Sequence, residues 1–212
     1  MTGRAVKRLF DVVCSFLGLV LLAPVFLVVA ILVKFDSKGP VFFKHERIGK
    51  DFRPFRVYKF RTMHEGAEQH GSSVTVGSDE RITKLGRMLR RTKIDELPQL
   101  LNVLKGDMSL VGPRPEVKKY VDLYEQEYRR LLTVRPGITD PASLHYSEEE
   151  KVLALSPNWE EDYRTRILPD KIRLSLQYVE NHSLGIDLSL NLRTFMKTSG
   201  MDRGHAVHKG HI

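Results

Sequence analysis

Residues 93–103 read Lys-Ile-Asp-Glu-Leu-Pro-Gln-Leu-Leu-Asn-Val, and residues 105–115 read Lys-Gly-Asp-Met-Ser-Leu-Val-Gly-Pro-Arg-Pro. The leucines of the first part recur at helical spacing, and Pro98 is tolerated only in a first turn. The pattern therefore predicts a helix with Asp95 and Glu96 at its N-terminus. Basic residues precede this pair, and a Gly/Pro-rich turn that carries Arg114 follows the helix.

Two interpretations of this carboxylate pair are open. Asp and Glu at a helix start commonly cap it, so capping is the ordinary one. The cationic surroundings favour chemistry instead, because a carboxylate among arginines stays ionised and ionised Asp95 can attack phosphorus. Glu96 can hold Mg²⁺, and Arg114, stiffened by flanking prolines, suits a two-pronged phosphate contact. Asp107 is a further candidate, but it fits a helix-ending turn equally well.

Length and charge bound the class of protein. The 212 residues suffice for one domain of ordinary size with a short membrane-associated piece. A net charge of +8 indicates anionic partners, which include nucleic acid, phospholipid head groups and phosphorylated small molecules. Cys14 is the single cysteine, so these residues form no disulfide framework.

The N-terminal segment is apolar from residue 12 to residue 33, which is roughly long enough to cross a bilayer as a helix. Basic residues flank both ends, Pro24 favours a kink, and we expect Asp11 near the lipid head groups, beside Lys7 or Arg8. These features favour a helix that enters the membrane, bends and returns to the same face. A spanning helix and a cleaved signal peptide are the alternatives.

A β-hairpin is predicted next, with strands at residues 41–43 and 55–60 and a turn at 48–51. Its dense basic residues are typical of an electrostatic footing on anionic lipid. Lys59 and Arg61 alternate with aromatic residues, so we expect them to share one face and to point together at a ligand.

A polar stretch at residues 64–77 predicts a mobile loop. His64 and His70 have no partner ligands at metal spacing, which argues against a metal site there. A helix is expected to begin at residues 78–80, and basic residues that include Arg91 lie near its C-terminal end, just before the carboxylate pair.

Further along the chain, residues 120–132 predict a charged amphipathic helix, and residues 186–196 predict a second one that rests on the membrane. Trp159 and Tyr163 fall on a short helix. For both we favour a packing role over stacking on a nucleotide base.

Several motifs occur in order along the chain: Lys-Arg-Leu-Phe-Asp at 7–11, the apolar segment broken at Pro24, Gly-Pro-Val-Phe at 39–42, Glu-Arg-Ile-Gly at 46–49, Tyr-Lys-Phe-Arg-Thr-Met at 58–63, and the block at 95–115. Together they resemble the bacterial sugar transferases that are small monotopic phosphoglycosyl transferases. The resemblance runs from about residue 7 to residue 198.

The resemblance implies an enzyme that transfers a phosphosugar from a UDP-sugar to polyprenyl (undecaprenyl) phosphate and releases UMP. It implies a covalent aspartyl-phosphosugar on Asp95, Mg²⁺ held by Glu96, and a role in the first membrane step of exopolysaccharide, lipopolysaccharide or other glycoconjugate assembly. The Arg-Pro-Gly-Ile-Thr sequence at 135–139 resembles a family signature. The catalytic residues would be Asp95 and Glu96, and the substrate-binding residues Lys59, Arg61, Arg91, Arg114 and Arg135.

The implied fold class is α+β and mostly helical. Residues 1–38 would form a re-entrant helix-break-helix segment, residues 39–200 a small catalytic domain with amphipathic surface helices and a short β-hairpin, and residues 201–212 a disordered tail. The expected location is the cytoplasmic face of the bacterial inner membrane, with the bilayer as partner and no nucleic acid. A homo-oligomer is left open.

The chain departs from the family pattern in two places. Asp140-Pro141-Ala142-Ser143 replaces a Gly-Trp-Ala-Gln type of sequence, and Ser175 stands where an acidic residue is often seen. The identity of the sugar is therefore open.

Two rival hypotheses remain at this stage. One is a membrane-anchored binding protein for anionic lipid or nucleic acid without catalysis, for which Asp95 would be dispensable. The other is one-step transfer with Asp95 as a metal ligand.

Overall fold

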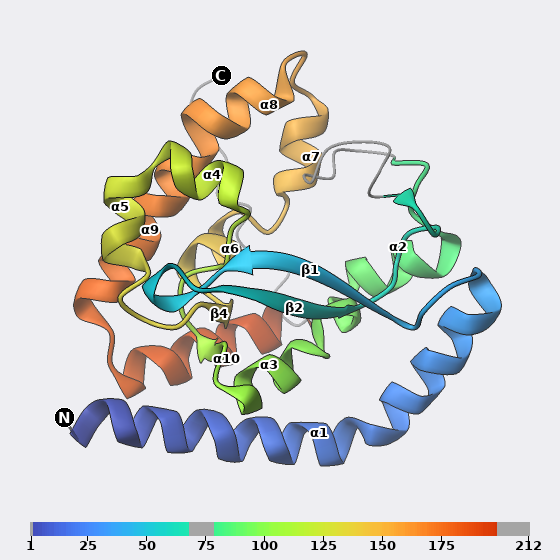
Figure 1. The fold of residues 1–212 in the computed structure, drawn as a ribbon, viewed down its shortest axis with the longest axis horizontal. Coiled ribbons are helices and arrows are strands. Elements are labelled where there is room, and N and C mark those ends of the chain that lie inside the picture. Colours follow the sequence, from blue (N-terminus) through green and yellow to red (C-terminus); the bar gives the residue numbers. More distant parts are fainter. Residues whose placement is uncertain (1, 68–78, 199–212) are drawn as a thin grey trace.

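The computed structural model describes residues 2–67 and 79–198. Helix α1 (Thr2–Asp36) runs along the base of the molecule and turns upward in its C-terminal part (Figure 1). In the portion of the chain that the structure covers, it is the one helix long and apolar enough to cross a membrane. The predicted helix is confirmed and extends beyond the apolar run. It contains Pro24, and its re-entry to the same face stays a prediction.

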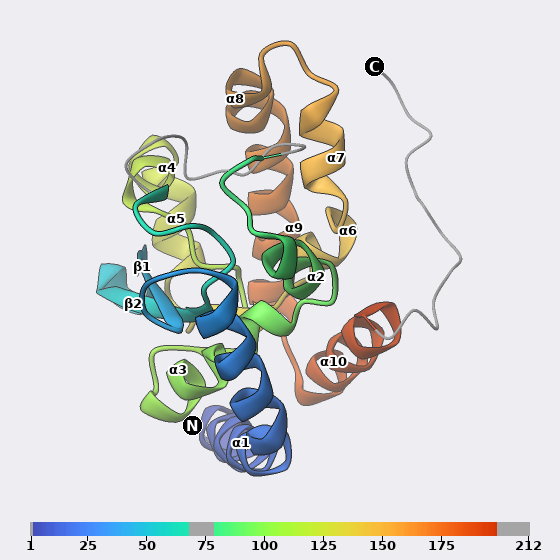
Figure 2. The same ribbon diagram turned by 90° about the vertical axis from the view of Figure 1, so that its right-hand side faces the viewer.

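One side of α1 carries exposed apolar side chains: Leu9, Val13, Phe16, Leu17, Val20, Leu21, Leu27, Val28, Ile31, Leu32 and Phe35. The side that faces the rest of the protein packs against α3 (Gln99–Lys105). In Figure 2, α1 is seen nearly end-on with α3 directly above it. An amphipathic arrangement of this kind leaves the apolar side free for a lipid environment.

Polar residues at the start of α1 point inward. Arg8 donates to the carbonyls of Val103 and Leu104, at 2.7 and 3.0 Å, in the last turn of α3. Buried Asp11 accepts a 2.8 Å hydrogen bond from Ser109 Oγ and a 3.3 Å bond from the backbone N–H of residue 110. The protein itself therefore satisfies this carboxylate, and the expectation that Asp11 lies at the depth of the lipid head groups stays a prediction.

Strands β1 (Phe42–Ile48) and β2 (Pro54–Phe60) form an antiparallel pair joined by the 3₁₀ turn η1 (Lys50–Phe52), which confirms the predicted hairpin. Asn102 of α3 fixes β2 by accepting from the N–H of Tyr58 at 3.0 Å and donating to the carbonyl of Arg56 at 2.8 Å. The hairpin is thereby held in place against α3.

Helix α2 (Lys84–Arg91) begins later than residues 78–80, so the predicted start is wrong. Asp79 instead accepts from the backbone and guanidinium of Arg81, and Thr83 caps the helix by accepting a 2.8 Å bond from Gly86 N–H. The short 3₁₀ helix η3 (Ile94–Glu96) then leads into α3. Most of the predicted loop at 64–77, with His70, lies outside the described residues.

Strands β3 (Ser109–Val111) and β4 (Gly137–Thr139) form a short parallel pair that the sequence did not predict. The chain passes very close to itself here: a Cβ added to Gly137 would lie 2.1 Å from Gly112 N. Only glycine allows this approach, and it brings the segments that follow both strands to the same edge.

The remaining helices pack into one layer above the hairpin (Figure 1). They are α4 (Lys118–Leu123), α5 (Glu125–Leu131), α6 (Pro141–His145), α7 (Glu149–Ala154), α8 (Trp159–Asp162), the π-helical turn η4 (Tyr163–Ile167) and α9 (Leu168–Asn181). The predicted helix at 120–132 is two helices. The backbone at Tyr124 leaves the helical region (φ −128°, ψ 44°), and its hydroxyl donates to the carbonyl of Arg164 at 2.7 Å.

Tyr163 is buried in the largest core cluster, with its ring centroid 5.0 Å from that of Tyr120. Trp159 packs, partly buried, against the same cluster. The packing role predicted for these two residues is confirmed.

Helix α10 (Leu184–Thr198) confirms the second amphipathic helix and lies on the same side of the molecule as α1 in both views (Figures 1 and 2). Its apolar residues Ile186, Leu188, Leu192 and Phe195 are exposed. Over the described ranges the protein is mostly helical, as expected, and it has two small two-stranded sheets, of which the hairpin was predicted. The predicted tail, residues 201–212, lies outside those ranges.

Candidate active site

Asp95 and Glu96 are both buried in η3, between the basic end of α2 and the start of α3. The turn is preceded by Lys93 in the left-handed region (φ 57°), and α3 is preceded by Pro98. Neither helix start has a side-chain capping hydrogen bond. The capping interpretation of the carboxylate pair is therefore wrong.

Glu96 is held by two cations. Lys59 Nζ lies 2.8 Å from Oε1, and Arg114 reaches both oxygens, with NH2 at 2.6 Å from Oε1 and NH1 at 3.3 Å from Oε2. Burial alone would raise the pKa of Glu96, but Arg114 and then Lys59 outweigh it and hold that pKa well below its usual range. The pair with Glu96 in turn raises the pKa of Arg114. Glu96 therefore favours its ionised form and holds the side chains of Lys59 and Arg114 in place.

Asp95 has the opposite environment. Its residue is 6% exposed, and its Oδ1 is buried without a hydrogen-bond partner. Burial raises its pKa, neighbouring Glu96 adds to the increase, and Lys59 opposes it. An unpartnered buried acceptor costs about 1–3 kcal/mol, so one that persists in a native site calls for a functional explanation.

Three segments bring this cluster together. Lys59 lies near the end of β2, the carboxylates lie on η3, and Arg114 follows β3 between Pro113 and Pro115. The structure therefore brings together three of the predicted site residues, Lys59, Glu96 and Arg114, although residues 59 and 114 lie 55 positions apart in the chain.

Two other predicted substrate ligands lie elsewhere. Arg61 follows the end of β2, is buried, and donates through NH2 to the carbonyls of Val33 and Ser37, at 3.2 and 2.6 Å, at the C-terminal end of α1. The expectation that it points with Lys59 at a common ligand is wrong, since its guanidinium binds the end of α1. Arg91 is exposed on the last turn of α2.

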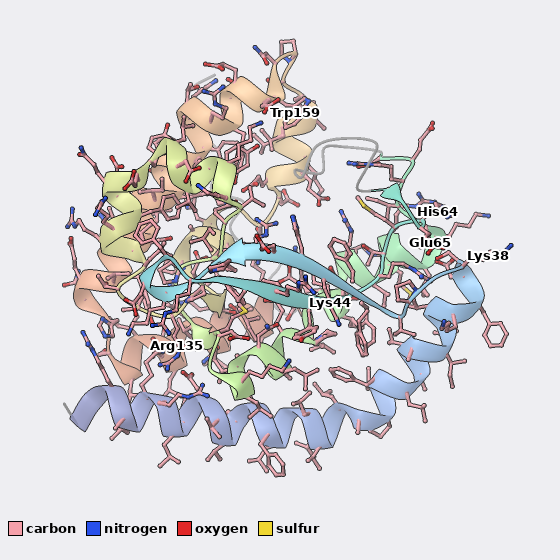
Figure 3. The ribbon with its side chains drawn as sticks, in the orientation of Figure 1. Lys38, Lys44, His64, Glu65, Arg135 and Trp159 are labelled. Carbon is pink, nitrogen blue, oxygen red and sulfur yellow. The ribbon has the colours of Figure 1, made fainter. Side chains whose placement is uncertain are left out.

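Arg135 is also separate from the carboxylate pair. Its Nε donates a 2.7 Å hydrogen bond to the carbonyl of Gly106, the left-handed residue (φ 92°) that ends α3. Figure 3 shows Arg135 above the N-terminal half of α1, whereas His64 lies at the opposite end of the molecule. The helix-ending turn predicted at Asp107 is confirmed, and Arg135 braces that turn.

Glu116 is a site residue that sequence reasoning missed. It is buried, accepts a 2.9 Å hydrogen bond from Tyr163 Oη, and forms a 3.2 Å ion pair with Arg47 NH1. These contacts anchor the segment that carries Arg114 to both the hairpin and the helical layer. The only signal in the sequence is an acidic residue directly after the Pro-Arg-Pro turn.

Asp95 and Glu96 are the carboxylates that could bind Mg²⁺ at this site. Within residues 2–67 and 79–198 no group of three or more His, Cys, Asp or Glu residues is arranged to hold a metal ion. Three of the roughly four lone-pair positions of Glu96 already face cations, whereas Asp95 Oδ1 is unpartnered. Such a set fits a Mg²⁺ that arrives with substrate phosphates and water, because this ion needs only one or two protein carboxylates.

Comparison with known proteins defines the class. The family model described as bacterial sugar transferase matches residues 2–200. Together with the fold and the carboxylate site, this match shows that the chain belongs to the bacterial sugar transferase family.

Individual relatives agree. The exopolysaccharide production protein PSS of Rhizobium leguminosarum bv. phaseoli is 41% identical over 205 residues, which cover 93% of this chain and 96% of that protein. The UDP-N-acetylgalactosamine-undecaprenyl-phosphate N-acetylgalactosaminephosphotransferase of Aeromonas hydrophila is 39% identical over 194 residues. The match covers 89% of this chain but only 42% of the Aeromonas protein. The UDP-glucose:undecaprenyl-phosphate glucose-1-phosphate transferase of Caulobacter vibrioides is 39% identical over 89% of this chain and 67% of its own.

Proposed function

We propose that this protein transfers a phosphosugar from a UDP-sugar to polyprenyl phosphate, with Asp95 as the nucleophile. Family membership supports the reaction class, and the names of the relatives from Aeromonas and Caulobacter support the acceptor and the donor. The observation that carries the role of Asp95 is its buried Oδ1, unpartnered and adjacent to a carboxylate that is fully engaged by cations.

The reaction has two displacements at one phosphorus atom. An Asp95 carboxylate oxygen attacks the sugar-bearing phosphorus of the donor, the bond from that phosphorus to the bridging oxygen breaks, and UMP leaves with the electron pair. An oxygen of polyprenyl phosphate then attacks the same phosphorus. The acyl-phosphate bond breaks and Asp95 returns to a carboxylate, so the enzyme ends the cycle unchanged.

The cations around Glu96 serve the phosphates. Arg114 presents a planar fork of donors suited to two phosphate oxygens, and Lys59 presents a compact charge between both carboxylates. Because Glu96 already holds them in place, they are positioned before substrate binds, which lowers the reorganisation needed during transfer. Mg²⁺ held by Glu96 together with substrate phosphates and water would supply further neutralisation of phosphate charge.

Helices α1 and α10 support the membrane location that we propose. Both helices expose apolar side chains on one side of the molecule, and α1 is fixed to α3, which begins just after the carboxylate pair. We place the protein at the cytoplasmic face of the bacterial inner membrane, with α1 entering the bilayer and returning. This arrangement would present a lipid-linked phosphate to Asp95.

The test is to incubate the purified protein with Mg²⁺, undecaprenyl phosphate and a panel of UDP-sugars, and to measure UMP release. We expect release with at least one donor, dependent on the acceptor for multiple turnovers. Absence of UMP with every donor would contradict the proposal. A protein that only bound anionic lipid would release none and would instead show salt-sensitive binding that does not depend on Asp95.

A further inference from the structure

A small cavity lies behind Arg114, on a part of the molecule that the reaction steps above do not use. Its volume is about 20 Å³, roughly the space of one water molecule. Arg114 contributes to the lining from the turn after β3, and Asp140 contributes from the residue directly after β4. Lys171 and Ser175 of α9 also line it.

The parallel pairing explains why Asp140 lies close to Arg114. Val111 pairs with Thr139, Gly112 N–H donates to the carbonyl of Thr139 at 3.0 Å, and Gly137 N–H donates to the carbonyl of Pro113 at 2.9 Å. The residues after both strands therefore emerge at one edge. A short parallel pair thus fixes the separation between an arginine and an aspartate that lie far apart in the chain.

Asp140 is almost completely buried, with 1% of the residue exposed. Its carboxylate accepts from the N–H of Ser143 at 2.8 Å and from Ser143 Oγ at 3.1 Å, and so caps α6. Any of Asp, Asn or Ser would cap a helix about equally well. Capping alone therefore does not account for an aspartate here. Burial raises the pKa of Asp140, and the Ser143 hydrogen bonds, Lys171 and Arg114 oppose that increase, so the charged carboxylate depends on nearby cations.

Acidic and basic side chains both line this cavity: Arg114, Glu116, Asp140 and Lys171. Arg114 also pairs with Glu96, and Lys171 pairs with Glu149 at 2.8 Å. We propose that Asp140 is a positioning residue, which holds the guanidinium of Arg114 in place from behind when substrate phosphates compete with Glu96 for it. The effect on catalysis rests on the proposed function, whereas the effect on Arg114 itself does not.

The variant Asp140→Asn removes the charge and keeps the cap and the volume. Because Arg114 contacts the donor phosphates in the proposed reaction, we expect KM for the UDP-sugar to rise by on the order of tenfold, since a misplacement of about 1 Å can cost up to about 100-fold. A merely structural defect would lower the apparent kcat through a smaller folded fraction and leave KM unchanged. Asp122→Asn, at an exposed site on α4, is the matched control.

A second variant moves the carboxylate across the cavity. Because Ser175 lines the same space from α9, D140S/S175D exchanges the two side chains and restores a negative charge beside Arg114. We expect KM to rise in the single variant D140S and to return most of the way to the original value in the double variant. The control D140S/S147D has the same net charge, but its new carboxylate lies at an exposed position between α6 and α7, and we expect no recovery.

A readout on Arg114 needs no turnover. Phenylglyoxal reacts more readily with an arginine side chain that is free to move than with one held by its partners. We therefore expect Arg114 to be modified faster in D140N than in the unsubstituted protein, and at close to the original rate in the exchange variant, measured by peptide mass spectrometry. Unchanged labelling and KM in D140N, or equal behaviour of the exchange variant and its S147D control, would overturn the assignment. If the unsubstituted protein released no UMP, the proposed function would fall, and the labelling would still decide the role of Asp140.

Discussion

Two buried clusters of acidic and basic side chains hold this protein together, and they differ in one respect. At the start of α1, Asp11 accepts two hydrogen bonds and Lys7 forms an ion pair with Asp187, which also accepts a 2.6 Å bond from Tyr178 Oη. At η3, Glu96 is equally well satisfied, but Asp95 keeps a buried oxygen without a partner.

The difference separates anchoring from chemistry. A fully paired cluster contributes to the placement of α1 and has no free oxygen to offer to a substrate. A cluster with one unpartnered carboxylate oxygen is less stable than it would be if that oxygen were satisfied, and it keeps an oxygen available for attack. We therefore expect substitutions in the first cluster to change stability and substitutions in the second to change activity.

The largest effect is expected for Asp95→Asn. Loss of the nucleophile should lower the rate of UMP release by at least about 1,000-fold, because removal of a single essential nucleophile abolishes most of the catalysis. Membrane association and the size-exclusion profile should stay as in the unsubstituted protein. Full activity in the purified variant would contradict the role of Asp95.

Arg114→Lys tests the fork of donors rather than the charge. Lysine retains the positive charge but cannot bind Glu96 or a phosphate through two parallel bonds, so kcat/KM should fall by about 100-fold. Arg129→Lys, at an exposed position on α5, is the matched control and should have no effect. A variant as active as that control would show that the two-pronged contact is unimportant.

Lys7→Ala tests the anchoring cluster. It leaves Asp187 buried beside Tyr178 without its cation, which should lower the free energy of unfolding by about 3 kcal/mol in detergent solution. Lys118→Ala breaks an exposed pair and should cost less than about 1 kcal/mol. Turnover per folded molecule should be unchanged in both variants. A loss of turnover in Lys7→Ala alone would contradict the view that the first cluster serves only stability.

The smallest effect is on the stability of Asp95→Asn. Burial raises the pKa of Asp95 in the folded protein, so the folded state binds this proton more tightly than the unfolded state does. Stability therefore falls as pH rises from the ordinary Asp pKa through the raised one. The variant should be more stable than the unsubstituted protein at neutral pH, and the gain should vanish below the ordinary Asp pKa. Equal stability of the two proteins in thermal denaturation at both pH values would contradict this account.

The sequence predicted the elements whose signals are local. The apolar run of α1, the hairpin turn at residues 48–51, and the helix after Pro98 each follow from periodicity or turn residues, and the structure confirms them. Strand alternation also singled out Lys59, and the motif around Asp95 singled out Glu96 and Arg114. The structure brings these three side chains together.

What the sequence did not predict depends on long-range pairing. Strands β3 and β4 are three residues each, too short for a periodic signal, yet they bring Asp140 beside Arg114. Arg61 was assigned to substrate because alternation placed it beside Lys59, but the end of α1 offers it carbonyl acceptors that no local pattern reveals. A family signature predicts a substrate-binding role for Arg135, which stays a prediction, whereas the brace that its Nε gives the end of α3 has no local signal.

Residue types alone do not distinguish the two clusters. Lys7, Arg8 and Asp11 looked like residues that flank a membrane segment, and Asp95 and Glu96 looked like helix caps. Only their partners distinguish them: the first group is satisfied by α3, α10 and the start of β3, and in the second group Asp95 is left open.

The central claim is that Asp95 becomes covalently bonded to the phosphosugar. The direct measurement is to incubate the purified protein with Mg²⁺ and a UDP-sugar labelled in the phosphate attached to the sugar, without polyprenyl phosphate, and to locate the label by peptide mass spectrometry. The account predicts one phosphosugar on the peptide that contains Asp95, released when polyprenyl phosphate is added, and none in Asp95→Asn. An unlabelled protein that still releases UMP as soon as acceptor is supplied would contradict it and would indicate one-step transfer.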